Sequence, residues 1–136
     1  MTADEIIVAM NCPTIRKGAT PEGMEKLQQT IGHRLPSSYV DLMNLTNGIE
    51  GFVGNVKYLM LWPVEEQAEL NEGYGAKEFA PGLWLIGSNG GDAGYAFDTR
   101  RHPMPIMEVP FLDMSSEDAK EIAPNFEGLI DYLQTA

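Results

Sequence analysis

The stretch LWLIGSNGGDAGYAFDT, residues 83–99, decides the fold of this chain. Two apolar runs, which begin at Leu83 and Ala93, flank a glycine-rich segment of the length that a turn requires. A third run, PIMEVPF from Pro105, follows after another turn signal. Three short apolar runs at this close spacing predict an antiparallel meander.

The glycines of GSNGGDAG, residues 87–94, raise the question of what kind of loop they form. A phosphate-binding loop needs its glycines between a strand and a helix, and here they lie between two predicted strands without a lysine. A calcium loop needs regularly spaced oxygen ligands and a closing glutamate, which Asn89, Asp92 and Asp98 do not supply. A hairpin turn explains the glycines through positive φ angles and close backbone approach. In that hairpin, Asp92 and Asp98 either accept hydrogen bonds from turn amides or contact a partner.

Helices are predicted on both sides of the meander. Residues 20–32 carry a capping threonine, an N-terminal proline and apolar side chains on one helical face. Residues 35–48 repeat the pattern, with Pro36 at the start and Gly48 as the left-handed residue that ends the helix. The stretch PNFEGLIDYLQTA, residues 124–136, contains a capping asparagine, Asn125, followed by an apolar stripe, which predicts a last helix packed on the sheet.

Shorter elements complete the expected fold. VKYLMLW, residues 56–62, is typical of a strand, and VEEQAELNEG, residues 64–73, predicts a short surface helix. The apolar stripe of that helix is expected to consist of Val64, Ala68 and Leu70. Residues 1–18 fit either a short helical turn or an edge strand. Together these elements predict one α+β domain with a mostly antiparallel sheet of about four to six strands flanked by helices.

The expected core follows from the large apolar side chains in these elements. It consists of Tyr39, Leu42, Trp62, Trp84, Leu85, Leu129 and Leu133. In the second run of the meander, Tyr95 and Phe97 alternate with smaller or polar residues, as in a half-buried strand. Cys12 is expected to be a small buried hydrophobe rather than a nucleophile.

Charge and composition limit the function. The 136 residues carry a formal net charge of −11 with only nine lysines and arginines, which argues against a nucleic-acid partner. An acidic surface favours a basic protein partner, although it also serves solubility. No apolar stretch reaches the roughly 20 residues of a membrane span, and Asp4 and Glu5 stand where a secretory signal has basic residues. With a single cysteine, we expect a cytoplasmic protein.

Catalytic signals are weak. His33 and His102 are the two histidines, and neither lies beside a serine or cysteine in a nucleophile motif. The RRH sequence, residues 100–102, is expected to form a solvated basic cluster in a turn. The residues therefore favour a protein that is not an enzyme and that needs no cofactor or metal.

Four motifs in order resemble those of the SUKH superfamily. They are LPSSYVDLMNLTNGIEG (35–51), VKYLMLWPVEE (56–66), PGLWLIGSNGGDAGYAFDT (81–99) and PNFEGLIDYL (124–133). The resemblance spans residues 35–133 and leaves residues 1–18 unassigned. It implies an α+β fold without catalytic machinery and, for many bacterial members, immunity against a toxin that is often a nuclease; other members are regulatory scaffolds. The family positions carried over are Pro36, Tyr39, Asn47, Gly48, Trp62, Pro63, Gly87, Asp92 and Asp98, most of them structural.

Three functional hypotheses follow. The first is an immunity protein that binds a basic toxin domain through an acidic concave face, the second a regulatory or scaffold module, and the third a small-ligand binder or enzyme. Carboxylates on or beside the central turns are the expected contact residues for a protein partner. They are Glu50, Glu65, Glu66, Glu69, Asp92 and Asp98.

Overall fold

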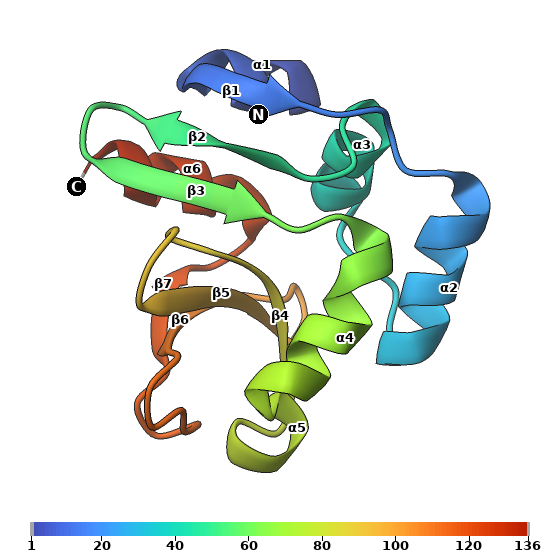
Figure 1. Cartoon of the computed structure of the whole chain (residues 1–136), viewed down its shortest axis with the longest axis vertical. Helices are drawn as coiled ribbons and strands as arrows, with labels where there is room; N and C mark the ends of the chain where they lie inside the picture. The colour runs from blue at the N-terminus through green and yellow to red at the C-terminus, as the bar shows by residue number, and fades with distance from the viewer. Residues whose placement is uncertain (1, 136) are drawn as a thin grey trace.

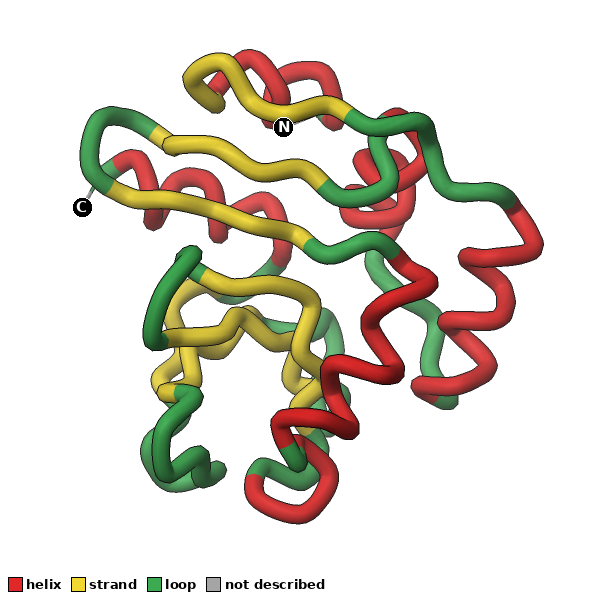
Figure 2. Tube along the Cα trace, in the orientation of Figure 1, coloured by secondary structure: helices red, strands yellow, loops and turns green. Residues whose placement is uncertain are grey.

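The computed structural model describes residues 2–135, which form a single seven-stranded sheet flanked by helices (Figures 1 and 2). Strands adjacent in the chain are adjacent in the sheet, and every neighbouring pair is antiparallel. The strands are β1 (Met10–Ile15), β2 (Ile49–Val53), β3 (Lys57–Leu61), β4 (Leu83–Ser88), β5 (Ala93–Asp98), β6 (Ile106–Pro110) and β7 (Lys120–Ala123). The helices are α1 (Ala3–Ala9), α2 (Pro21–Ile31), α3 (Ser37–Leu45), α4 (Val64–Tyr74), α5 (Ala76–Phe79) and α6 (Phe126–Gln134). The α+β prediction is confirmed, with one strand more than the expected range.

The N-terminal segment forms both structures that its sequence left open, a helix and then an edge strand. Thr2 and Glu5 make a reciprocal capping box at the start of α1, with N–H···O distances of 3.2 and 2.9 Å. Strand β1 then pairs with β2 and bulges after Asn11. Cys12 lies in this bulge with a φ of 44° and is exposed, so the expectation that it is buried is wrong. A bulge at a sheet edge turns its extra residue out of the ladder.

Strands β2 and β7 were not predicted. Glu50 and Gly51 interrupt the apolar pattern of β2, and β7 has four residues of which the first two are exposed and charged. Pairing with a neighbour, rather than local propensity, makes these segments strands.

The sheet has a buried core on each side. Side chains from α1, α2, α3 and α6 build the larger core against one side of the sheet, which we call the covered side. Figure 1 shows α3 and α6 behind β2 and β3. The smaller core lies on the opposite side, the open side, where residues of α5 and of the loop after β6 pack against β4, β5 and β6. The tube in Figure 2 shows β2 and β3 at the front of the molecule, with helices behind them.

The end of α3 differs from the prediction in one respect. The helix ends at Leu45. Gly48 has a φ of 90°, and a Cβ on it would lie 2.8 Å from the Leu61 carbonyl oxygen and 3.0 Å from the Pro63 nitrogen. Asn47 instead caps the start of α4, where its Oδ1 accepts a hydrogen bond from the Val64 amide at 2.9 Å. Asn47 therefore caps the next helix, α4, whose own N-cap residue, Pro63, has no capping side chain.

The glycine-rich stretch is a hairpin between β4 and β5, as predicted. Asn89 Oδ1 accepts hydrogen bonds from the amides of Gly91 and Ala93, and Gly90 has the positive φ of 81° that the turn requires. The absence of side chains at Gly90 and Gly94 also makes room for rings from neighbouring segments. A Cβ on Gly90 would lie 2.8 Å from the ring of Tyr58, and one on Gly94 would lie 2.6 Å from that of Phe111.

Most of the predicted core is buried, with two corrections. Trp84 is only partly buried, because it faces a hollow between α2 and α4 instead of the sheet interior. Strand β5 is buried on both sides rather than on one: Tyr95 and Phe97 join the larger core, while Ala96 joins the smaller one. The remaining six predicted core residues are at most 7% exposed.

Candidate functional site

Helix α4 stands beside the sheet and is held there by Gln67, whose side chain is fully buried. Its Nε2 donates to the Tyr39 hydroxyl at 2.7 Å and to the Trp62 carbonyl at 3.1 Å, and its Oε1 accepts from Trp84 Nε1 at 2.9 Å. Burial raises the pKa of Tyr39, which keeps this hydroxyl neutral. Gln67 thereby links α4 to α3, to the residue that follows β3 and to β4.

Asn71, one helical turn further on, joins α4 to strand β4. Its Nδ2 donates to the Leu85 carbonyl at 2.9 Å, and its Oδ1 accepts from the Leu85 amide at 2.8 Å, as a neighbouring strand would. The inner face of α4 therefore consists of Val64, Gln67 and Asn71, which corrects the expected stripe of Val64, Ala68 and Leu70. The i, i+3, i+7 spacing of these three residues, with carboxylates elsewhere on the helix, is the sequence signal that identifies this face.

Within residues 2–135, no helix covers the open side of β2 and β3 (Figure 1). Phe52 and Tyr58 face each other there in a T-shaped pair with ring centroids 5.0 Å apart, and Phe52 is 46% exposed. Next to them Glu50 lies opposite Met60, and its carboxylate accepts a hydrogen bond from the Tyr58 hydroxyl at 2.6 Å. That hydrogen bond to a carboxylate raises the pKa of Tyr58. We use "open face" below for Phe52, Tyr58 and Met60.

An aromatic stack continues the open face towards α4. Tyr74, at the end of α4, stacks on Phe111 with ring centroids 4.1 Å apart and an interplanar angle of 9°. Trp62, just after β3, lies parallel to Tyr74 at 6.2 Å. Tyr74 is 38% exposed, and Leu112 beside Phe111 is 82% exposed, so apolar surface reaches the solvent here. Exposed apolar surface that is contiguous in this way marks interaction sites in soluble proteins.

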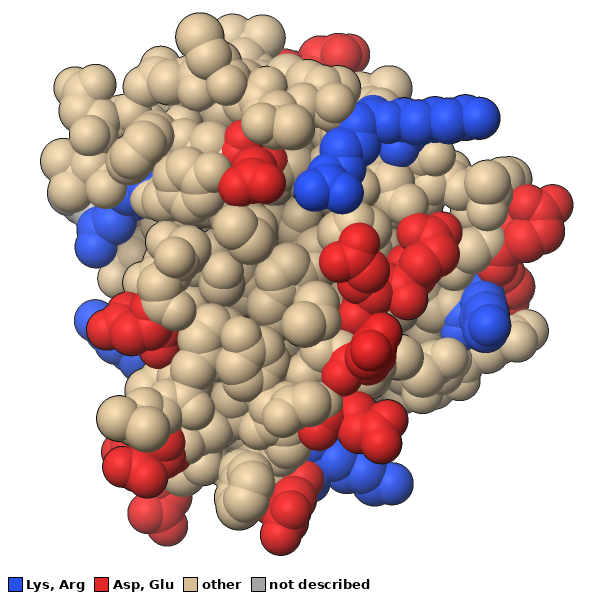
Figure 3. Space-filling view, viewed as in Figure 1, with Lys and Arg blue, Asp and Glu red and all other residues tan. Residues whose placement is uncertain are grey.

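Helix α4 borders this apolar surface with carboxylates. Four glutamates and no lysine or arginine lie within Val64–Tyr74. In Figure 3 acidic side chains form a column over α4, and the surface beside the column is largely uncharged. A shallow groove of about 440 Å³ runs along this flank of the helix. Its lining residues are Glu66, Glu69, Leu70, Gly73 and Tyr74.

Of the six predicted contact residues, four lie next to the apolar surface that the open face and the aromatic stack form together. Glu50 lies on β2, and Glu66 and Glu69 lie on the flank of α4 that also carries Tyr74. Asp92 is exposed in the hairpin turn, and its backbone carbonyl accepts a hydrogen bond from the Phe111 amide at 2.9 Å. Its carboxylate accepts from Asn89 Nδ2 at 3.2 Å.

Glu65 and Asp98 are placed differently. Glu65 accepts a hydrogen bond from Asn47 Nδ2 at 2.6 Å and therefore belongs to the junction between α3 and α4. Asp98 is 2% exposed and accepts hydrogen bonds from the Arg100 amide at 3.0 Å and from Arg101 Nε at 3.1 Å. Burial alone raises the pKa of Asp98, but the hydrogen bonds from these two arginines outweigh it and leave the pKa below its ordinary value. This geometry fits the turn-anchoring role of Asp98.

The basic RRH segment is correspondingly less free than expected. Arg100 Nε pairs with Asp98 at 2.9 Å, and Arg101 bridges Asp98 to Glu121 on β7, the latter at 2.8 Å. Both arginines thus hold the β5–β6 loop in place instead of forming a purely solvated cluster. The rings of His33 and His102 lie 5.8 Å apart at the surface.

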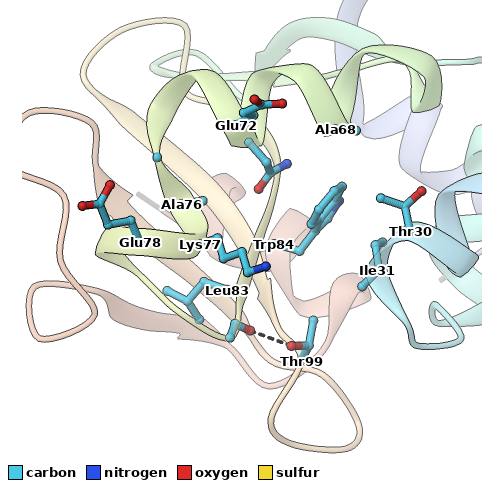
Figure 4. Close-up of a pocket in the computed structure, with 13 residues that line it drawn as sticks. Thr30, Ile31, Ala68, Glu72, Ala76, Lys77, Glu78, Leu83, Trp84 and Thr99 are labelled. Carbon is cyan, nitrogen blue, oxygen red and sulfur yellow. Dashed lines mark hydrogen bonds between the residues drawn. The ribbon is translucent and has the colours of Figure 1, made fainter.

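A larger hollow of about 720 Å³ lies on the other flank of α4, between α2, α5 and the start of β4 (Figure 4). The Lys77 ammonium is directed into it near Trp84, whereas the Glu78 carboxylate is turned away. Its other polar groups are engaged within the fold: Thr99 Oγ1 donates to the Gly82 carbonyl at 2.7 Å, and Trp84 Nε1 is held by Gln67. The hollow therefore presents few free groups that converge on a ligand.

Among the helices within residues 2–135, none combines the length and apolar character of a membrane span. Within the same residues, no three histidine, cysteine, aspartate or glutamate side chains converge in a way that could hold a metal ion.

Comparison with known proteins places this geometry in a family. Residues 18–132 match the SMI1/KNR4 family (SUKH-1), over most of the chain. The chain is also 29% identical over 117 residues to YnaB, an uncharacterised protein of Bacillus subtilis (strain 168). That alignment covers 85% of this chain and 76% of YnaB. The matched region includes the whole of α4, the open face and the hairpin.

Proposed function

The chain belongs to the SMI1/KNR4 family (SUKH-1), and on that premise we propose that it is a non-enzymatic immunity protein that neutralises a basic toxin domain by one-to-one binding. One observation carries the proposal. The carboxylates of Glu50, Glu66, Glu69 and Asp92, from three separate elements, border one exposed apolar face. An apolar centre with a charged rim is the usual composition of a protein-protein interface.

The charges on α4 support a basic partner. Glu69 lies three or four residues from each of Glu65, Glu66 and Glu72, which places like charges next to one another on the helix surface. With no lysine or arginine in α4, this repulsion is not compensated within the helix. A partner that brings lysines or arginines to this surface relieves the repulsion on binding, and the net charge of −11 steers such a partner to the protein.

Neutralisation then follows from competition for a basic surface. An enzyme that acts on nucleic acid binds phosphates with clustered lysines and arginines. Carboxylates on α4 and on the hairpin pair with those same lysines and arginines of the toxin. Burial of the apolar face adds affinity. In this mechanism the immunity protein supplies no reacting group and acts only by covering the partner's surface.

Co-purification from the native host tests the proposal. Tagged protein is captured, and the retained proteins are identified by mass spectrometry and then purified with it. We expect a basic domain in a one-to-one ratio whose toxic activity is lost when one equivalent of this protein is added. Recovery of several unrelated regulators, with no toxic domain among them, overturns the immunity proposal in favour of a scaffold. A small molecule that is retained and turned over contradicts both.

Charge reversal supplies the matched control. Glu66→Lys at the border of the open face is expected to slow association with the captured domain about tenfold at low salt, with little change in dissociation. Asp131→Lys, on α6 at the covered side, makes the same change in net charge away from the proposed site and is expected to slow it less than about threefold. Equal effects of the two variants would mean that only the net charge matters.

A further inference from the structure

The packing of α4 does not require glycine at position 73. It lies inside the helix, its φ is outside the left-handed region, and a Cβ placed on it meets no atom within 4 Å. Alanine therefore fits at this position, and glycine weakens a helix relative to alanine. The neighbouring Gly75 differs, because its φ of 73° ends the helix. The space above Gly73 is kept empty by the sequence and not by packing.

Gly73 lines the groove of about 440 Å³ along α4. Leu70 and Tyr74 provide apolar lining, and Glu66 and Glu69 place two carboxylates at its rim. Neither carboxylate forms a hydrogen bond or ion pair with another side chain in residues 2–135. Long basic side chains have this same division, with an apolar stem and a charged head.

Exposed apolar side chains lie next to the groove. Tyr74 is shared between the groove and the aromatic stack, and Phe111 and the open face continue the apolar surface from there. A ligand that enters the groove therefore has exposed apolar side chains immediately beside it. A free metal ion or a small anion gains nothing from the apolar lining of the groove or from the neighbouring aromatic rings.

We propose that the groove over Gly73 receives the side chain of a single arginine or lysine from a protein partner, and that apolar residues beside it in that partner cover Tyr74, Phe111 and the open face. The basic head pairs with Glu66 and Glu69, while its methylene stem lies over Gly73 against Leu70. The inference deepens the proposed function and rests on it for the identity of the partner, but the groove itself is testable without that partner.

The test uses arginine amide as the probe and citrulline amide as its control, both acetylated at the α-amino group, so that they have nearly the same shape and differ in the charge of the guanidinium. Both are titrated into isotopically labelled full-length protein, and backbone amide signals are followed by NMR. We expect the signals of residues 66–74 to shift saturably with arginine amide at millimolar concentration and to stay in place with citrulline amide. Shifts that spread over all exposed carboxylates, or that gather around Trp84 in the larger hollow, overturn the proposal.

Two variants of α4 make the test specific. Gly73→Leu fills the groove and is expected to weaken arginine amide binding at least about tenfold, while it raises the thermal midpoint by a few degrees because leucine favours helix. Ala68→Leu places the same side chain on the other flank of α4, which lines the larger hollow, and is expected to change binding less than about twofold. Unchanged binding in Gly73→Leu contradicts the inference.

The same variants separate this inference from the proposed function. If the captured toxin binds Gly73→Leu as tightly as the natural protein, immunity stands and the groove is not its anchor. If arginine amide binds at the groove but no toxic domain is recovered from the host, the groove stands and the immunity proposal fails.

Discussion

The covered side and the open side of this sheet are built by the same strands, but their side chains differ in exposure to solvent. In β2 and β3, Ile49, Leu59 and Leu61 point to the covered side and are at most 2% exposed. Phe52, Tyr58 and Met60 alternate with them on the open side, where they are exposed or only partly buried. The difference comes from coverage rather than from residue type, because both sets are largely apolar. Apolar side chains without a covering helix are the ones that remain available to a partner.

The largest expected effect tests whether stability resides on the covered side. Leu42 of α3 is fully buried in the larger core, and Leu42→Ala is expected to lower the free energy of unfolding by about 2–5 kcal/mol. Phe52→Ala on the open face is expected to lower it by less than about 1 kcal/mol, because the ring is 46% exposed. Urea unfolding of both variants measures the contrast, and equal losses would show that the open face is part of the structural core.

A glycine pair tests the strand junction between the two halves of the sheet. A Cβ on Gly87 would overlap the Met60 carbonyl oxygen, where β3 and β4 are joined by only two residue pairs. Gly87→Ala is therefore expected to destabilise the protein by about 1–3 kcal/mol. Gly91→Ala, in the same glycine-rich stretch but with no close atom nearer than 3.6 Å, is expected to change stability little. Thermal unfolding of the two variants distinguishes a steric requirement from a general need for glycine.

This contrast also shows what sequence reasoning could reach. The meander of β4, β5 and β6, the capped helix α2 and the last helix α6 were predicted because their caps, turns and periodicity are local. Strands β2 and β7 were not predicted, and β1 was only one of two alternatives, because pairing with a neighbouring strand rather than local propensity makes these segments strands. The position of Cys12 was wrong for a related reason, since a bulge in the β1–β2 pairing decides it.

The site was predictable only in part. Acidic residues beside the central turns drew attention to Glu50, Glu66, Glu69 and Asp92, which lie next to exposed apolar surface and whose role as contacts stays a prediction. Sequence alone did not reveal the aromatic stack, because Trp62, Tyr74 and Phe111 come from three segments that only the fold brings together. Gln67 was missed because a glutamine is buried only where its hydrogen bonds are satisfied, and the sequence does not show which groups satisfy them.

Two aspartates near the hairpin allow a buried, structural carboxylate, Asp98, to be compared with an exposed one, Asp92. Asp98→Asn is expected to cost about 1 kcal/mol at neutral pH because it weakens a buried, charge-assisted network, whereas Asp92→Asn on the exposed turn costs less. The folded-state pKa of Asp98 is lowered, so its stabilising contribution is complete above the unfolded-state pKa and is lost as the pH falls through the folded-state value. The difference in thermal midpoint between Asp98→Asn and the natural protein should therefore stay constant above about pH 5 and shrink in more acidic solution. A difference that grows on acidification contradicts this assignment.

The smallest expected effect is a gain in stability on the open side. Glu69 adjoins three like charges on α4, so Glu69→Gln is expected to stabilise the free protein by about 0.5 kcal/mol at low salt. Glu65→Gln is the matched control, because Glu65 lies in the first turn, accepts a hydrogen bond from Asn47 and benefits from the helix dipole. It is expected to lose a little stability instead. Urea unfolding at low and high salt measures both, and screening should remove the gain in Glu69→Gln.

If Glu69→Gln gains stability and also binds a basic partner more weakly, the repulsion on α4 is retained for binding. If it loses stability in the free protein, the carboxylate serves the fold, and the separation between a structural covered side and a binding open side no longer holds at this helix.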